Sequence, residues 1–189
     1  ANAAERLWLA GADTVKVGIG PGSLCTTRIE TGNGVPQLTA LMDVYEKREE
    51  LHKFRMPYDK KQLYIIADGG IKSAGDIVKA LCFSDMVMAG NLFAGCDETP
   101  GNIINIDGRQ YKEYVGSSTH KSNHIEGVAA IVPYKGSYDS IQTRLIEGLR
   151  SGCSYQGAHN LVELKDNPQF VKISSAGLKE SHPHDVIVK

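Results

Sequence analysis

The chain has 189 residues, of which 23% are charged, and a formal net charge of −1. A chain of this length is long enough for one domain with its own core. Because a near-neutral charge balance offers no electrostatic footprint for a polyanion, we expect no nucleic acid among its partners.

Cysteine usage and hydropathy restrict the cellular setting. The four cysteines, Cys25, Cys82, Cys96 and Cys153, are widely spaced and form no C-x-x-C pair. This spacing argues against a zinc site or a disulfide framework and is typical of a reducing compartment, so we expect a cytoplasmic location. No apolar run approaches the roughly 20 residues that cross a bilayer, and we expect neither a membrane partner nor a secretory leader.

The hydrophobic pattern predicts strands that alternate with helices. In chain order we expect a helix over 2–10, a strand over 14–19, a helix over 37–54, a strand over 63–67, a helix over 73–82, a strand over 85–89, a hairpin of 103–106 with 110–114, a helix over 138–150 and a short strand over 170–173. Apolar strands that alternate with helices indicate a parallel sheet covered on both faces. The first helix has little room for a cap, so we expect the chain to begin inside a larger domain.

Each of the first three predicted strands runs into a glycine-containing loop with polar residues. The loops are 18–28, Asp68-Gly69-Gly70 and Gly90-Asn91. In α/β folds ligands bind at the carboxyl ends of the strands. Since no G-x-G-x-x-G with a trailing acidic residue follows a strand, three such loops predict the mouth of a (β/α) barrel rather than a dinucleotide-binding crevice.

The first of these loops contains Cys25 and Arg28, and its residues alone leave two interpretations open. A glycine-rich turn can bring backbone N–H groups close to a phosphate, and a thiol beside a cation can have a lowered pKa and act as a nucleophile. Alternatively the loop is structural and the thiol is inert, as most free cysteines are.

The sequence of this loop resembles that of a known enzyme family. Residues 17–28, Val-Gly-Ile-Gly-Pro-Gly-Ser-Leu-Cys-Thr-Thr-Arg, closely resemble the signature loop of IMP dehydrogenases and GMP reductases. Further segments agree in the same order, at 66–71, 88–95, 111–114, 126–136 and 176–185. The resemblance implies a (β/α)8 TIM barrel. Residues 1–189 would form the later, C-terminal part of one catalytic domain, with a short flap near 115–127, a tail over 174–189 and a homotetrameric assembly.

The resemblance also assigns chemistry to individual residues. It implies that Cys25, with Thr27 nearby, attacks C2 of the purine of a nucleoside monophosphate, and that a hydride passes between C2 and NAD or NADP. The implied substrate-binding residues are Ser23, Gly70, Gly90, Asn91 and Tyr114 at the 5′-phosphate, Asp68 at the ribose hydroxyls and Glu126 at the base edge. It implies a phosphate site with little cationic charge, and the residues that bind the dinucleotide are not identified.

A monovalent cation, K⁺, is the second group that the resemblance implies. Its ligands would be Gly20, Gly22 and Cys25, through carbonyl oxygens, together with Glu180, Ser181 and His182 from the tail of a neighbouring subunit. Hard cations prefer such oxygen ligands. Taken without the resemblance, His182-Pro183-His184-Asp185 could instead be a transition-metal site, which is the less favoured interpretation.

The segment before Glu126 departs from the family pattern. IMP dehydrogenases hydrolyse the covalent intermediate with an Arg-Tyr pair on a mobile flap, and residues 118–125 contain no such pair. If hydrolysis takes place without that pair, Thr27, His120 or Lys121 would have to activate the water.

GMP reductases do not need the pair but use a threonine and a glutamate. Thr27 matches the threonine, whereas Thr119 or His120 replaces the glutamate. We therefore predict an IMP dehydrogenase-like oxidoreductase that makes XMP with NAD in guanine nucleotide biosynthesis. The alternatives are a GMP reductase, which converts GMP to IMP and ammonia with NADPH, and a catalytically silent nucleotide-binding homologue.

Overall fold

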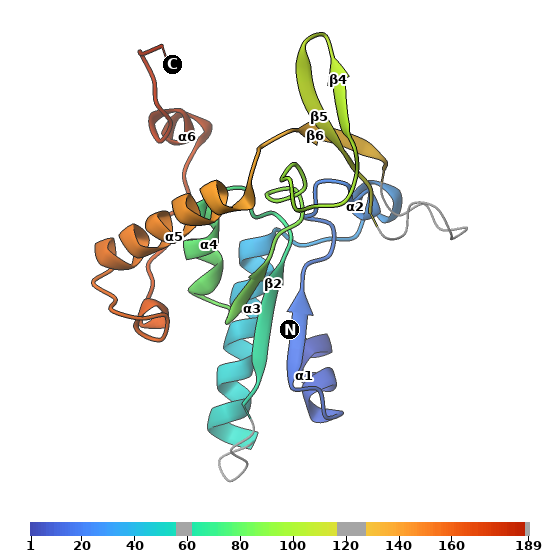
Figure 1. The fold of residues 1–189 in the computed structure, drawn as a ribbon. Helices are drawn as coiled ribbons and strands as arrows, with labels where there is room; N and C mark the ends of the chain where they lie inside the picture. Colours follow the sequence, from blue (N-terminus) through green and yellow to red (C-terminus); the bar gives the residue numbers. More distant parts are fainter. Residues whose placement is uncertain (56–61, 117–127, 188–189) are drawn as a thin grey trace.

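The fold contains two three-stranded sheets, one parallel and one antiparallel (Figure 1). The structure is a computed structural model that describes residues 1–55, 62–116 and 128–187. The parallel sheet consists of β1 (Thr14–Val17), β2 (Tyr64–Asp68) and β3 (Met86–Met88), in that order. These strands form an open sheet, so within the described ranges the expected barrel is not closed.

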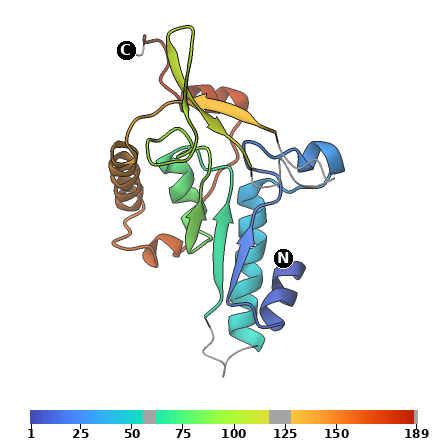
Figure 2. The ribbon, with the colours of Figure 1, turned by 45° about the vertical axis from the view of Figure 1, so that its right-hand side comes forward.

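The register of the parallel sheet brings the carboxyl ends of its strands to one edge. Val17 pairs with Ala67, and Asp68 pairs with Met88. The loops that follow the three strands therefore leave the sheet from the same edge, as the sequence predicts. The antiparallel sheet projects beyond that edge (Figures 1 and 2).

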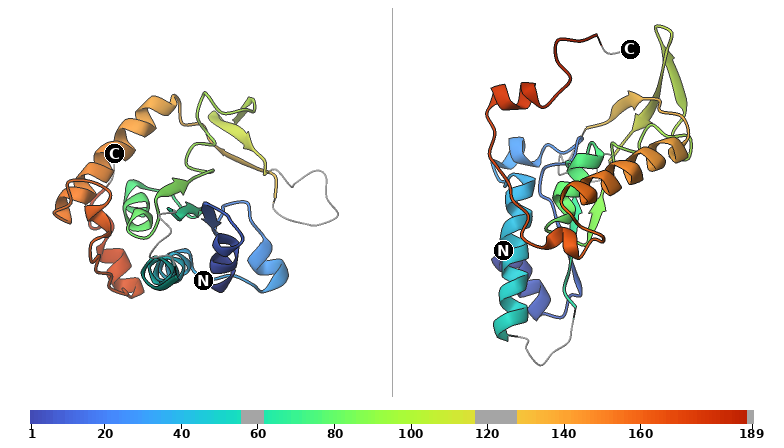
Figure 3. Two further views of the ribbon diagram at one scale, coloured as in Figure 1. Left: turned by 90° about the horizontal axis from the view of Figure 1, so that it is seen from below. Right: turned by 90° about the vertical axis from the view of Figure 1, so that its left-hand side faces the viewer.

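Helices lie in an arc along one face of the parallel sheet (Figure 3). They are α1 (Asn2–Leu9), α3 (Gln37–Glu50), α4 (Ala74–Leu81) and α5 (Tyr138–Tyr155). The core contains fully buried side chains of Trp8, Leu41, Leu63 and Ile65. Within the described ranges, no helix is both long and apolar enough to cross a membrane.

The two faces of the parallel sheet differ, because side chains alternate along a strand. The side chains packed into the core are Val15, Val17, Ile65, Ala67 and Val87. Those on the other face are half-buried or exposed: Lys16, Tyr64, Ile66, Met86 and Met88. The sequence predicts a sheet covered on both faces, but in the described part of the chain helices cover only one.

The antiparallel sheet contains β4 (Ile103–Ile106), β5 (Arg109–Tyr114) and β6 (Ala130–Pro133). The predicted hairpin is confirmed, since Asp107 and Gly108 both have positive φ, at 48° and 76°, and form its two-residue turn. The predicted pattern did not include β6, which pairs with β5.

A cluster of charged groups around Asp85, with Arg48 buried and Asp85 and Lys165 half-buried, links the start of β3 to the helical layer. The Asp85 carboxylate accepts hydrogen bonds from Arg48 of α3, at 2.9 Å, from the Ile65 N–H of β2, at 2.8 Å, and from Lys165. Burial alone would raise the pKa of Asp85. The hydrogen bonds from Lys165 and Ile65 and the charge of Arg48 outweigh burial and hold that pKa below its usual value.

The elements predicted from the sequence differ from the observed ones mainly in short segments and at the ends of helices. The expected strand over 170–173 is wrong, because this segment is irregular and Val171 is exposed. The expected helix over 37–54 changes to a π-helical turn at Leu51–Arg55, and α5 runs on to Tyr155. Three short elements were not expected: α2 (Thr27–Thr31), a 3₁₀ turn at Glu163–Lys165 and α6 (Ser175–Glu180).

Candidate functional site

The strand ends at the candidate site are joined by one buried amide. Gln37, the first residue of α3, donates from its Nε2 to the Val17 carbonyl of β1, at 2.8 Å, and to the Asp68 carbonyl of β2, at 3.3 Å. Two loops begin at these positions: the Cys25 loop, defined as residues 18–28, and the Asp68-Gly69-Gly70 turn. The amide therefore holds the starting points of both loops together.

Cys25 is half-buried near the end of the Cys25 loop. Its Sγ donates to the Thr27 hydroxyl, at 3.2 Å, and its N–H donates to the Gly22 carbonyl, at 3.1 Å. Thr27 starts α2, so this short helix fixes the position of the thiol's partner. The structure thus brings together the two predicted catalytic residues.

Arg28 acts on the backbone of the loop. Its Nε donates to the Ile19 carbonyl at 3.1 Å, and a terminal nitrogen donates to the Val35 carbonyl at 2.6 Å. These two bonds hold the Ile19 and Val35 carbonyls against the Arg28 side chain and so stabilise the glycine-rich turn. The hydrogen-bond partner of the Cys25 thiol is the Thr27 hydroxyl rather than the guanidinium.

A cavity of about 230 Å³ opens where the three strands end. It is lined by six of the seven residues predicted to bind substrate, namely Ser23, Asp68, Gly70, Gly90, Asn91 and Tyr114. These residues come from four separate parts of the chain. The seventh, Glu126, lies outside the described residues, and the individual roles of all seven stay predictions.

Tyr114 reaches the cavity from β5 and lies against Gly90. An ideal Cβ at position 90 would lie 2.4 Å from the Tyr114 hydroxyl oxygen, so a side chain there would displace the ring. Burial, and then the negative charge of Asp68, raise the pKa of Tyr114. The hydroxyl therefore keeps its proton and can donate a hydrogen bond to an anion in the cavity.

Two lysines that the sequence interpretation did not use are placed near this site. Lys16 forms an ion pair with Asp68, and Lys72 lines the cavity. Lys16 was detectable in principle, because it pairs with Ile66, and residues two apart on a strand share a face. Two lysines therefore lie beside the cavity, although the residues predicted to hold the phosphate include no Lys or Arg, and the expectation of a phosphate site with little cationic charge stays a prediction.

The predicted cation ligands fall into two separate groups. Gly20, Gly22 and Cys25 lie together on the Cys25 loop. Glu180 ends α6 and Ser181 and His182 follow it, and α6 lies on the far side of the molecule from α2 (Figure 1). One copy of the chain does not join the two groups, and the contribution of a neighbouring subunit stays a prediction. Among the described residues, no cluster of three His, Cys, Asp or Glu side chains could hold a metal ion.

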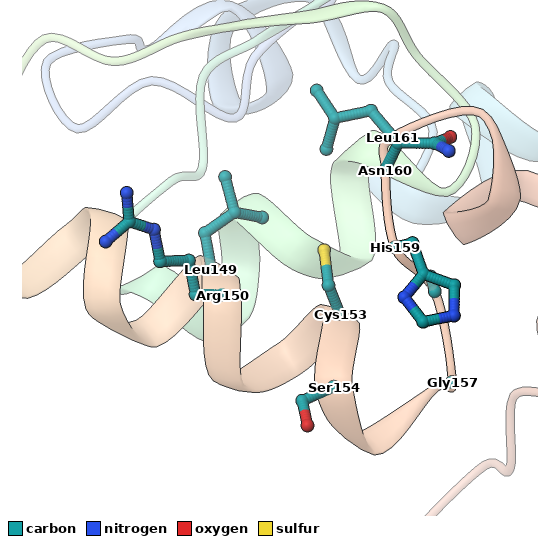
Figure 4. A pocket seen from close by; sticks show the side chains of 9 residues that line it. Leu149, Arg150, Cys153, Ser154, Gly157, His159, Asn160 and Leu161 are labelled. Carbon is teal, nitrogen blue, oxygen red and sulfur yellow. The ribbon is translucent and has the colours of Figure 1, made fainter.

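A second cavity, of about 420 Å³, lies at the end of α5 and contains none of the predicted site residues (Figure 4). Cys153 projects from α5 toward the segment that carries His159 and Asn160. It is a half-buried free thiol, as Cys25 is. Replacement of Cys153 is therefore a matched control for chemistry at Cys25.

Comparison with known proteins identifies the family. A family profile described as the IMP dehydrogenase / GMP reductase domain matches residues 1–184. The chain belongs to this family. Curated inosine-5′-monophosphate dehydrogenases from Chlorobaculum tepidum and Borreliella burgdorferi are 45% and 46% identical over 99% and 98% of the chain, which covers 40% and 48% of their lengths. The chain thus spans less than half of either relative.

A solved structure from the family shows the same architecture. It is a cysteine-to-alanine variant of GMP reductase from Trypanosoma brucei in complex with guanosine 5′-monophosphate. It is 39% identical, with a TM-score of 0.86, over 99% of this chain and 39% of its own. The expected resemblance is confirmed at the level of family and local α/β architecture.

Proposed function

We propose that the chain carries the nucleophile and the nucleotide-binding loops of an IMP dehydrogenase-like oxidoreductase, within the later half of a (β/α)8 barrel. The observation that carries this proposal is the cavity at the strand ends, where Asp68, Gly90 and Tyr114 meet beside the Cys25 loop. Support comes from the IMP dehydrogenase relatives, which are about 45% identical.

The cavity suits the phosphate and ribose of a nucleoside monophosphate. Its volume of about 230 Å³ is below the range of roughly 300–1,000 Å³ typical of small-molecule pockets, so the base would extend toward Cys25. The Ser23 and Tyr114 hydroxyls would bind the phosphate together with backbone N–H groups at Gly70 and Asn91. Carboxylates accept hydrogen bonds, so Asp68 would bind the ribose hydroxyls.

In the proposed reaction the thiol proton passes to N3 as the Cys25 sulfur bonds to C2 of hypoxanthine, and the C2–N3 double bond becomes single. The C2 hydrogen then leaves with its electron pair, and N3 releases its proton to solvent as the double bond forms again. NAD supplies the hydride acceptor when it is bound. Water then adds across the C2–N3 double bond, the C–S bond breaks, and the remaining proton of the water passes to the sulfur, which releases XMP and regenerates the thiol. Before the attack, the Thr27 hydroxyl accepts a hydrogen bond from the Cys25 thiol and so orients the sulfur.

The described residues include no identified dinucleotide site, and we assign no residue to NAD. The proposed chemistry of this chain is therefore limited to binding IMP, orienting the thiol and carrying the covalent adduct.

GMP reductase is the second candidate function. Two observations favour it: the match to a GMP reductase with bound guanosine 5′-monophosphate, and a sequence over 115–127 without the Arg-Tyr pair. In that reaction the exocyclic amine leaves C2 as ammonia and a hydride from NADPH replaces it. The same thiol and the same phosphate-binding loops would be used.

Two assays separate the candidates. The protein is incubated with IMP plus NAD and, separately, with GMP plus NADPH, while the absorbance of the reduced cofactor is followed. We expect absorbance to rise with IMP and NAD. A fall with GMP and NADPH alone would identify a reductase, and IMP binding without turnover in either assay would identify a silent homologue.

A further inference from the structure

The loop that lines the cavity after β3 is held by an ammonium group from another part of the chain. Lys135 follows β6, and its Nζ donates to the carbonyls of Asn91, at 2.6 Å, and Leu92, at 3.1 Å. The Lys135 N–H also donates to the Gly95 carbonyl, at 2.9 Å. One residue therefore fixes both ends of the turn over 90–95.

The turn that Lys135 holds is the one that borders the candidate phosphate site. The N–H groups of Phe93 and Ala94 both donate to the Gly90 carbonyl, which closes a single helical turn. Gly90 and Asn91, at the start of this turn, line the cavity. Because the peptide group is planar, binding the Asn91 carbonyl fixes the plane of the peptide that joins Asn91 to Leu92, directly next to the Asn91 N–H that is the proposed phosphate donor. The position of Lys135 therefore determines how the turn presents its backbone.

The Lys135 ammonium contacts backbone carbonyls. Among the described residues, no carboxylate oxygen lies within 4.0 Å of its Nζ, which contacts neutral carbonyls instead. Burial, and the nearby charge of Arg144, lower the pKa of Lys135, while Cys96 opposes them. A cation in such surroundings is stabilised by an anion bound close by.

We propose that Lys135 is a positioning residue for the nucleotide phosphate: its ammonium fixes the turn over 90–95 and supplies positive charge from behind it. This inference rests on the proposed function, because it assumes that the ligand is a nucleoside 5′-monophosphate. Lys135 does not line the cavity. It therefore acts through Asn91 and Leu92, and its removal affects the phosphate rather than the base or the thiol.

Lys112 provides a matched control. It is a buried lysine on β5, and its Nζ also donates to carbonyls of the same region, those of Cys96, Asp97 and Thr99. None of these three residues lines the cavity. Replacing Lys112 by Met tests the loss of a carbonyl-binding ammonium near the turn, without loss of the contact to Asn91.

The test compares IMP with inosine, which lacks the phosphate. Binding of IMP is measured by calorimetry, and inosine binding by competition with IMP, for the wild type, Lys135→Met, Lys135→Arg and Lys112→Met. We expect Lys135→Met to weaken IMP binding by about 10- to 100-fold and inosine binding by less than about twofold. Lys135→Arg keeps most of the IMP affinity, and Lys112→Met weakens both ligands to the same extent.

Kinetics give a second readout. Lys135→Met is expected to raise KM for IMP while kcat stays within about twofold, because the lysine does not reach the reacting atoms. If Lys135→Met unfolds, Lys135→Gln removes the charge and keeps an N–H donor for the same comparison. Equal losses for IMP and inosine in the Lys135 variants, or an unchanged IMP affinity, would overturn the inference. If the wild type itself shows no preference for IMP over inosine, the proposed function fails instead.

Discussion

The hydroxyl of Tyr114 fills the space that a Cβ at position 90 would need, with only 2.4 Å between the two positions. Tyr114 belongs to β5 of the antiparallel sheet, whereas Gly90 lies in the loop that follows β3 of the parallel sheet. Their contact brings the antiparallel sheet against the carboxyl edge of the parallel sheet, and the candidate cavity lies beside this contact.

Gly90→Ala should therefore displace Tyr114 and weaken IMP binding by about tenfold or more, measured by calorimetry. Gly75→Ala, on α4, is the matched control. A Cβ at position 75 would lie 3.7 Å from Ser73 Oγ, which is an ordinary van der Waals distance. We expect the control to bind IMP normally and to be slightly more stable, since alanine favours a helix.

The double variant Gly90→Ala with Tyr114→Phe separates space from hydrogen bonding. Removing the hydroxyl relieves the contact, because the next ring atom lies 3.5 Å from the Cβ position. We expect the double variant to be more thermally stable than Gly90→Ala alone, because the contact is relieved, while IMP binding stays weak without the phenolic donor. Full recovery of binding would show that the hydroxyl is not a phosphate ligand.

Asp68→Asn should weaken binding of nucleotides that carry a ribose 2′-hydroxyl. An amide accepts fewer hydrogen bonds than a carboxylate and cannot pair with Lys16. We expect KM for IMP to rise by about 10- to 100-fold and the preference for IMP over 2′-deoxy-IMP to disappear. Asp43→Asn, an exposed position on α3, is the control. A preference that survives in Asp68→Asn would remove this residue from the ribose site.

Asp85→Asn tests this charge cluster. The carboxylate accepts bonds from Arg48, Lys165 and the Ile65 N–H, so the amide leaves both cations poorly paired. We expect the free energy of unfolding in urea at pH 7 to fall by about 2–4 kcal/mol. Asp43→Asn should change it by less than about 0.5 kcal/mol.

The same cluster sets a pH dependence. Because the folded pKa of Asp85 is lowered, its contribution to stability is complete above the unfolded value of about 3.9 and is lost as the pH falls through the folded pKa. Between pH 5 and pH 2 the wild type should therefore lose more stability than Asp85→Asn. Parallel curves for the two proteins would contradict the assigned pKa direction.

The sequence predicts the parallel strands and their loops because those strands are short apolar runs that end at glycine. Asp68 and Gly90 could be placed at one edge from this pattern alone. It does not predict α2, which has no buried side chain, or β6, in which only Val132 is buried, because neither has a periodic apolar pattern. The segment over 170–173 has strand-like composition, but it pairs with none of the strands in the described part of the chain, and Phe170 packs on Phe83.

Contacts between residues that are distant in sequence were the least predictable feature of the fold and of the site. Lys135 and Asn91 are 44 residues apart, and Lys165 and Asp85 are 80 apart. Local periodicity carries no information about such pairs. Lys16 is different, because strand alternation alone places it on the same face of the sheet as Asp68.

The proposed mechanism requires that Cys25 become covalently bound to the purine during turnover. The most direct test is to quench the protein during turnover with IMP and NAD and to locate any nucleotide adduct by peptide mass spectrometry. We predict an adduct on Cys25 in the wild type and in the control Cys153→Ser, and neither adduct nor turnover in Cys25→Ser. Turnover retained in Cys25→Ser, or an adduct confined to another residue, would show that Cys25 is not the nucleophile.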